Sequence, residues 1–177
     1  TWKDMTKIKI TTTDLSPTAA QMPRIMGLGL ASKLFREDSN LHQFKTLSNN
    51  GNEVVFGTIG DGSTSEGIFL EAINAMGVLQ IPVVMSVWDD GHAISVPVEK
   101  QTTKGSISEA LKGFAKENNS NGIEILKARG WNYPELCAVY DKAAKIARKV
   151  HTPVLVHVIE LTQPQGHSTS GSHERYK

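Results

Sequence analysis

Short apolar runs alternate along the chain with longer stretches in which apolar residues recur every three or four positions. Short runs of this kind are typical of buried β-strands, and the periodic stretches are typical of helices that pack against them. The short runs predict strands at 53–60, 81–88, 122–128 and 152–161. The periodic stretches predict helices at 18–37, 63–80, 107–117 and 133–150.

Strands and helices that alternate in this way predict an α/β fold, a parallel sheet with helices on both faces. A turn is predicted at 48–52, SNNGN, and the polar first dozen residues are expected to form an extended arm or a lone strand. In such folds ligands bind beyond the carboxyl ends of the strands. The segments that follow the predicted strands are therefore the candidates for a functional site.

Composition narrows the choice of partners and compartment. The chain has 177 residues, which fits one domain, and its net charge of +1 gives no strong attraction to nucleic acid or to an anionic membrane. No apolar run approaches the roughly 18 residues of a membrane span. Neither nucleic acid nor a membrane is therefore expected as a partner. Cys137 is the only cysteine, which excludes an internal disulfide and suits a reducing compartment. Its place in an amphipathic stretch predicts a buried structural thiol.

The first polar segment, GDGSTSEG at 60–67, places Asp61 between two glycines at a strand-to-helix junction. Glycines let a ligand approach the main chain, and a helix N-terminus attracts phosphate. A phosphate beside Asp61 requires a divalent cation between the two, and Mg²⁺ typically binds one or two carboxylates together with phosphate oxygens. The alternative is an aspartate that caps a helix in a Gly-rich turn.

The second polar segment, DDGHAIS at 89–95, places Asp90 one helix and one strand after Asp61. One right-handed crossover has this length, so both acids are expected at the same edge of the sheet. Two carboxylates with a main-chain carbonyl nearby would form a site for a hard cation, although a plain turn before Gly91 is the alternative. The third segment, QPQGHSTSGSH at 163–173, suits a phosphate or carboxylate ligand, or is a flexible tail.

Taken in order, these segments resemble the thiamine diphosphate enzymes. The greatest resemblance is to the alpha subunit of the decarboxylating first component of 2-oxo-acid dehydrogenase complexes, in its branched-chain (2-oxoisovalerate) form. GDGSTSEG resembles that family's metal and diphosphate loop, and DDGHAISVPVEKQT at 89–102 resembles its NNGYAIS-P---Q turn. The segment 16–33 is similar to the helix after its pyrimidine-contacting loop, and GHSTS at 166–170 to the loop whose His approaches the diphosphate.

The resemblance implies thiamine diphosphate and Mg²⁺ as cofactors, bound by one domain at 1–177 that lacks the pyrimidine-binding domain. It implies Asp61, Asp90 and the main-chain carbonyl of His92 as metal ligands. It also implies that His167 contacts the diphosphate or the substrate and takes part in catalysis. The residues implied to bind the cofactor are Ser16, Thr18, Gly60, Asp61, Gly62, Ser63, Asp90, His92, Ile94 and His167.

The implied activity is oxidative decarboxylation of a branched-chain 2-oxo acid or pyruvate, with transfer of the acyl group to a lipoyl carrier. The implied partners are a pyrimidine-binding (beta-type) domain or subunit and a lipoyl acyltransferase, within a homo- or hetero-oligomer, and the isolated domain is expected to be inactive. The expected location is the cytoplasm of a bacterium or the mitochondrial matrix of a eukaryote. A transketolase-like or deoxyxylulose-phosphate synthase-like enzyme, or a non-catalytic module of the same fold, is the alternative.

Two positions depart from the family pattern and make the cofactor site more anionic. Asp90 stands where the family has a ligating Asn, and Gln163 stands where it usually has a phosphate-binding Arg. We hypothesise that a cation elsewhere in the full protein compensates, or that this domain alone binds the cofactor weakly. Asp89, the neighbour of Asp90, is interpreted as a turn-forming residue or as a hydrogen-bond acceptor behind the metal ligands.

Overall fold

The computed structural model describes residues 4–9, 16–163, 167 and 171–175. One sheet contains four parallel strands in the order β1–β2–β6–β5. These strands are β1 (Val55–Gly60), β2 (Val83–Trp88), β5 (Glu124–Arg129) and β6 (Val154–Ile159), and a separate antiparallel pair joins β3 (His92–Ala93) to β4 (Val96–Pro97). Each strand of the main sheet lies at a predicted position, which confirms the parallel α/β fold.

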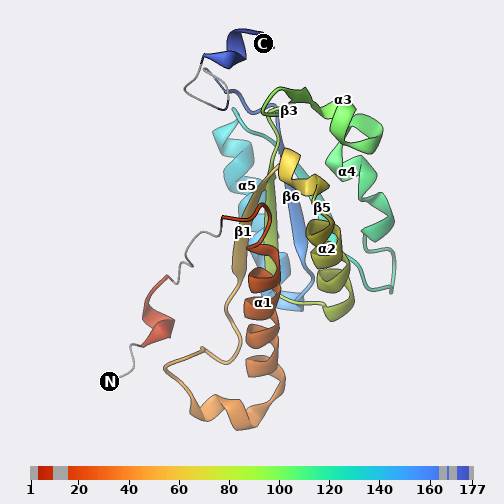
Figure 1. Ribbon diagram of the computed structural model, residues 1–177. Helices are drawn as coiled ribbons and strands as arrows, with labels where there is room; N and C mark the ends of the chain where they lie inside the picture. Colours follow the sequence, from red (N-terminus) through yellow and green to blue (C-terminus); the bar gives the residue numbers. More distant parts are fainter. Residues whose placement is uncertain (1–3, 10–15, 164–166, 168–170, 176–177) are drawn as a thin grey trace.

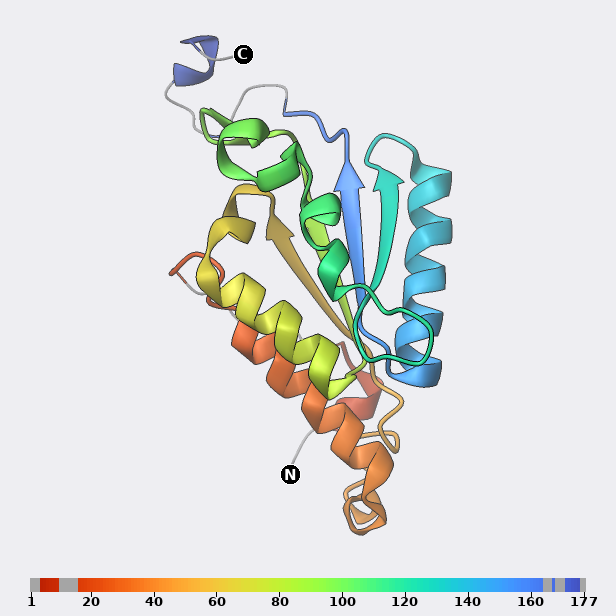
Figure 2. The same ribbon diagram turned by 90° about the vertical axis from the view of Figure 1, so that its right-hand side faces the viewer.

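Helices cover both faces of the sheet (Figures 1 and 2). The helices are α1 (Met22–Glu37), α2 (Gly67–Leu79), α3 (Val98–Gln101), α4 (Ile107–Ala110) and α5 (Tyr133–Val150). Helices α1 and α2 lie side by side on one face, with α4 in the same core, and α5 covers the other face. Successive side chains of a strand point to opposite faces, so Met85 of β2 packs under α1 and α2, whereas Val84 packs under α5.

Several predicted elements are shorter or different in the structure. The helix predicted at 18–37 begins only at Met22. The helix predicted at 107–117 ends at Ala110, because Gly113 is a poor helix former and Ala115 bridges to Ile123 beside β5. The helix predicted at 63–80 begins only at Gly67, after a 3₁₀ turn at Gly62–Ser65. In the N-terminal arm, Met5–Lys7 form a 3₁₀ turn capped by Asp4 rather than a strand.

Cys137 is exposed, so the prediction of a buried thiol is wrong. The side of α5 that packs on the sheet repeats every three or four residues, through Leu136, Tyr140, Ala143 and Ala147. Cys137 comes one residue after Leu136, so it lies outside this stripe and its side chain faces solvent. In the part of the chain that the structure describes, no helix is long and apolar enough to cross a membrane.

Candidate functional site

The loops after β1 and β2 meet at the carboxyl edge of the sheet, as the sequence predicted. Gly60 at the end of β1 pairs with Trp88 at the end of β2, and the N–H of Asp61 donates to the carbonyl of Trp88 at 3.0 Å. A Cβ atom on Gly62 would lie 2.5 Å from the Cβ of Ala93, so the two loops pack together only because position 62 has no side chain. Asp61 and the turn that carries Asp90 are therefore direct neighbours.

Asp61 is almost completely buried, with 4% of its surface exposed. Its Oδ2 atom accepts a hydrogen bond from Nε2 of Gln101 at 3.2 Å, and its main-chain carbonyl accepts from the amide and the hydroxyl of Thr64 at 3.0 and 2.6 Å. Burial, together with the charges of Asp89 and Asp90, raises the pKa of Asp61 to about 6. The hydrogen bonds to this carboxylate thus do not offset the cost of burying its charge. A buried carboxylate in this situation favours the binding of a cation.

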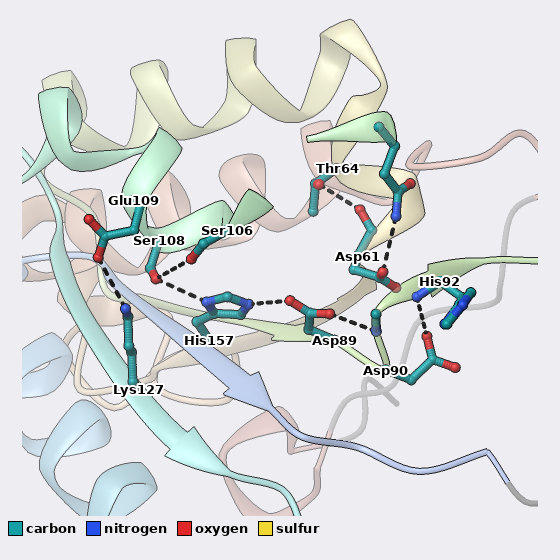
Figure 3. Close-up of polar contacts among 12 residues, drawn as sticks. Asp61, Thr64, Asp89, Asp90, His92, Ser106, Ser108, Glu109, Lys127 and His157 are labelled. Carbon is teal, nitrogen blue, oxygen red and sulfur yellow. Dashed lines mark hydrogen bonds and ion pairs between the residues drawn. The ribbon is translucent and has the colours of Figure 1, made fainter. Parts of the chain in front are cut away.

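The two adjacent acids of the turn have different partners (Figure 3). Asp89 accepts a hydrogen bond from Nε2 of His157 at 2.8 Å and another from the N–H of Gly91 at 2.9 Å. Burial opposes ionisation of Asp89, but these two hydrogen bonds outweigh it and lower its pKa. Asp90 accepts from the N–H of His92 at 3.1 Å. Asp89 is therefore a half-buried hydrogen-bond acceptor of the turn, and Asp90 remains the candidate ligand.

The turn between β2 and α3 contains two residues with positive φ, Gly91 at 82° and Ile94 at 58°. The left-handed conformation is costly for a β-branched residue, by about 1–3 kcal/mol, and persists where the surrounding structure enforces it. Here β3 and β4 pair directly on either side of Ile94. The side chain of Ile94 is 56% exposed at the edge of the site, where a ligand could cover it.

The other predicted site residues lie at or near the same edge, with one exception. Ser16 and Thr18 precede α1, whose N-terminus lies beside the carboxyl end of β1 (Figure 1), and Nε2 of Gln21 donates there to the carbonyl of Thr58 at 3.0 Å. Ser63 lies in the 3₁₀ turn that leads into α2. His167 is exposed, but its neighbours in sequence lie outside the described residues, and none of the contacts found among the described residues joins it to Asp61.

The oxygen atoms at this edge are of the chemical kind that a divalent cation binds. Within the described ranges, no three His, Cys, Asp or Glu side chains converge on a common metal position. The ligands predicted from the sequence are not three side chains. They are two carboxylates, those of Asp61 and Asp90, and the main-chain carbonyl of His92. Mg²⁺ commonly completes such a partial set with phosphate and water oxygens.

Comparison with known proteins identifies the family. Residues 2–177 match the model of a family described as "Dehydrogenase E1 component". The chain belongs to this family. The resemblance seen in the sequence motifs is thereby confirmed, and this E1 chain can be compared with individual relatives.

Relatives among characterised proteins are alpha subunits. The chain is 30% identical over 161 residues to the 3-methyl-2-oxobutanoate dehydrogenase subunit alpha of Mycobacterium tuberculosis, covering 91% of this chain and 38% of that protein. It is also 30% identical over 163 residues to the mitochondrial 2-oxoisovalerate dehydrogenase subunit alpha 1 of Arabidopsis thaliana, covering 92% of this chain and 30% of that protein. The E1 chain thus spans about a third of the length of these relatives.

Solved transketolase structures share the fold of this E1 chain. A transketolase of Pichia stipitis superposes with a TM-score of 0.64 at 21% identity, over 85% of this chain and 21% of that one. A transketolase of Campylobacter jejuni gives a TM-score of 0.57 at 17% identity, over 88% of this chain and 22% of that one. At these identities the likeness concerns the fold alone.

Two residues of the site were not found by reading the sequence. Gln101 lies within the motif at 89–102, but its hydrogen bond to Asp61 depends on how α3 folds back over the first loop. His157 stands inside the apolar run of β6, where one buried polar residue indicates a hydrogen-bonding partner without identifying it. In this E1 chain His157 has two such partners, Asp89 and Ser108.

Proposed function

We propose that this chain is the diphosphate-binding domain of an alpha-type E1 component, and that it anchors Mg²⁺ and thiamine diphosphate for the oxidative decarboxylation of a 2-oxo acid. The observation that carries the proposal is the meeting of the buried Asp61 with the turn of Asp90, in a chain of the dehydrogenase E1 family. Relatives named for 2-oxoisovalerate, 3-methyl-2-oxobutanoate and pyruvate support a branched-chain 2-oxo acid or pyruvate as the substrate.

In this proposal the residues of the chain bind and orient the cofactor. Asp61, Asp90 and the carbonyl of His92 would hold Mg²⁺. The main-chain N–H groups at the start of α2 would bind the diphosphate, and Gly60, Gly62 and Ser63 would let it approach. Ser16 and Thr18 would contact the pyrimidine, Ile94 would pack against the cofactor, and His167 would contact the diphosphate or the substrate. When bound, thiamine diphosphate supplies the carbanion chemistry of the reaction.

The proposal also implies partners outside this chain. A pyrimidine-binding (beta-type) domain or subunit would complete the cofactor site, and a lipoyl acyltransferase would receive the acyl group, within an oligomer. The chain itself would be one domain, inactive alone. The expected compartment is the bacterial cytoplasm or the mitochondrial matrix, in line with bacterial relatives and with relatives named as mitochondrial.

The test is carbon dioxide release by the intact protein that contains this chain, together with its partner subunit if that is separate. We expect release from a branched 2-oxo acid or from pyruvate, and we expect it to require both Mg²⁺ and thiamine diphosphate. Faster release from the branched acid than from pyruvate would identify the branched-chain form. Absence of release from every 2-oxo acid, with the cofactor bound, would favour the non-catalytic alternative. The departures at Asp90 and Gln163, which add a negative charge and omit a positive one, also suggest that alternative.

Replacing Asp90 with Asn should tighten the binding of Mg²⁺ and thiamine diphosphate, by roughly three- to tenfold. Asn retains an oxygen that can accept from the N–H of His92 and bind the metal, and its neutrality removes one of the charges that raise the pKa of Asp61. Calorimetric titration of the intact protein measures the dissociation constant. Asp141→Asn, which changes an exposed partner of Lys145 on α5, is the control. Weaker binding by the Asp90 variant would mean that a cation elsewhere in the protein already compensates this charge.

A further inference from the structure

A line of buried and half-buried polar side chains connects α4, through β6, to the turn that carries Asp90 (Figure 3). His157 of β6 is 1% exposed, with Nδ1 3.0 Å from Oγ of Ser108 and Nε2 2.8 Å from Oδ2 of Asp89. Ser108 of α4 is buried as well, and its Oγ lies 3.3 Å from Oγ of Ser106. The other oxygen of Asp89 accepts from the N–H of Gly91. The line thus runs from a helix in the core to the main chain of the turn.

The ionised carboxylate of Asp89 determines the roles of the other groups in this line. A carboxylate only accepts, so Nε2 of His157 carries a proton and donates it to Asp89, while Nδ1 forms a hydrogen bond with the hydroxyl of Ser108. Asp89 is thereby held from two sides, by an imidazole donor and by the N–H of Gly91. Each of these bonds is charge-assisted, and such bonds are stronger than those between neutral groups.

The main chain of the turn forms other hydrogen bonds, but these do not involve the N–H of Gly91. The N–H of Asp89 donates to the carbonyl of Val158, and the N–H of Val98 donates to the carbonyl of Gly91, both at 2.9 Å. The N–H of Gly91 donates to the Asp89 carboxylate instead. The peptide that leads into Gly91 therefore takes its orientation from Asp89, and the same peptide carries the carbonyl of Asp90.

We propose that His157 is a positioning residue for the cofactor turn. By holding Asp89 it fixes the main chain at Gly91, and so it sets the direction in which the Asp90 carboxylate and the His92 carbonyl face Asp61. The cofactor in this inference rests on the proposed function, whereas the link from His157 to Gly91 is made entirely by described residues of this chain. Without the donor at His157, the Asp89 carboxylate would rotate toward water and release the N–H of Gly91.

Two amide substitutions separate the two contacts of His157. In His157→Gln the amide nitrogen can take the place of Nε2, so it still donates to Asp89. In His157→Asn the shorter side chain places its amide near Nδ1, so it keeps Ser108 within reach but not Asp89. Both variants bury one amide in β6, and a general disturbance of the core would therefore affect them alike.

The first measurement uses the full-length protein without cofactor. Hydrogen exchange of the peptide that spans 88–95 should be at least about tenfold faster in His157→Asn than in the wild type, and unchanged in His157→Gln. Equal exchange in the two variants would contradict the positioning role. Thermal melting shows whether each variant folds. If His157→Asn does not fold, Asp89→Ala removes the same contact by changing the half-buried Asp89 instead. It also removes the acceptor of the N–H of Gly91, so it should accelerate exchange at least as much.

The second measurement is the dissociation constant for Mg²⁺ with thiamine diphosphate. Residues that hydrogen-bond near metal ligands typically contribute about ten- to a hundredfold to metal affinity, so His157→Asn should weaken binding about tenfold. Asp89→Ala should also weaken it, but by less, because this change removes a negative charge beside Asp61 as well. The double variant should be no weaker than His157→Asn, because that variant already lacks the contact between His157 and Asp89. His157→Gln should bind like the wild type. Additive losses would overturn the proposal. A wild type that does not bind the cofactor would contradict the proposed function alone, since hydrogen exchange still decides the role of His157.

Discussion

Replacing Asp61 with Asn is expected to abolish the binding of Mg²⁺ and thiamine diphosphate and, at the same time, to stabilise the cofactor-free protein. Asn has the same shape, and its oxygen can still accept the hydrogen bond from Gln101. Asp61 is the more deeply buried of the two predicted carboxylate ligands, and it is the anionic ligand that remains when Asp90 is replaced by Asn. Asn at position 61 cannot supply that anionic oxygen, so we expect a loss of affinity of more than about a hundredfold. The stabilisation follows from the burial of Asp61 beside two other acids.

The size and the pH dependence of the stabilisation follow from the pKa of Asp61. Its pKa is about 6 in the folded protein, against 3.8 for an ordinary aspartate, and this difference corresponds to about 3 kcal/mol of unfavourable free energy once the carboxylate is ionised. The folded state binds more protons than the unfolded state between these two values. The stability contributed by the protonated carboxyl is therefore complete below the lower value and is lost as the pH rises through about 6.

Melting of the cofactor-free protein at two pH values measures this effect. At pH 7 the Asn variant should melt above the wild type, and the difference should nearly vanish toward pH 4. Addition of Mg²⁺ and thiamine diphosphate should raise the melting temperature of the wild type and leave that of the variant unchanged. Asp141→Asn, on the exposed side of α5, should change neither quantity. A variant that melts below the wild type at pH 7 would show that ionised Asp61 is already compensated without a cation.

The meeting of Asp61 with the turn of Asp90 could be predicted from the sequence because it depends on few physical rules. The periodicity of apolar residues locates β1, α2 and β2, and the handedness of the crossover between parallel strands brings the two loops to one edge. The meeting of the two loops depends less on the contacts of individual side chains. Errors of a few residues in a helix boundary, such as the start of α2 at Gly67, did not change it.

Contacts made across the fold could not be predicted in the same way. The hydrogen bond from Gln101 to Asp61 and that from His157 to Asp89 each join elements whose relative placement depends on the packing of the whole core. Cys137 is exposed, whereas its neighbour Leu136 packs, partly buried, against the core. The two differ only by one step around the helix, which periodicity does not resolve. The role of His167 stays a prediction, because the residues on both sides of it lie outside the described part of the chain.

Replacing Gly62 with Ala should damage the site through packing rather than through charge. The new Cβ would lie 2.5 Å from the Cβ of Ala93 and 3.1 Å from its Cα, and main-chain atoms cannot rotate away as a flexible side chain can. The turn at 89–95 must therefore move away from the loop of Asp61. We expect a loss of roughly 1–3 kcal/mol in the free energy of unfolding and a loss of at least about tenfold in cofactor affinity.

Gly67→Ala is the matched control for this change, because it adds the same methyl group to the same segment. A Cβ on Gly67, the first residue of α2, meets no atom within 4 Å, and alanine favours a helix over glycine by up to about 1 kcal/mol. Cofactor affinity should therefore remain at the wild-type value. Adding Ala93→Gly to the Gly62 variant removes the shorter of the two contacts and should restore part of the affinity. If Gly62→Ala binds the cofactor as tightly as Gly67→Ala, close packing of the two loops does not align Asp61 with Asp90, and hydrogen bonds such as that from Gln101 must hold them instead.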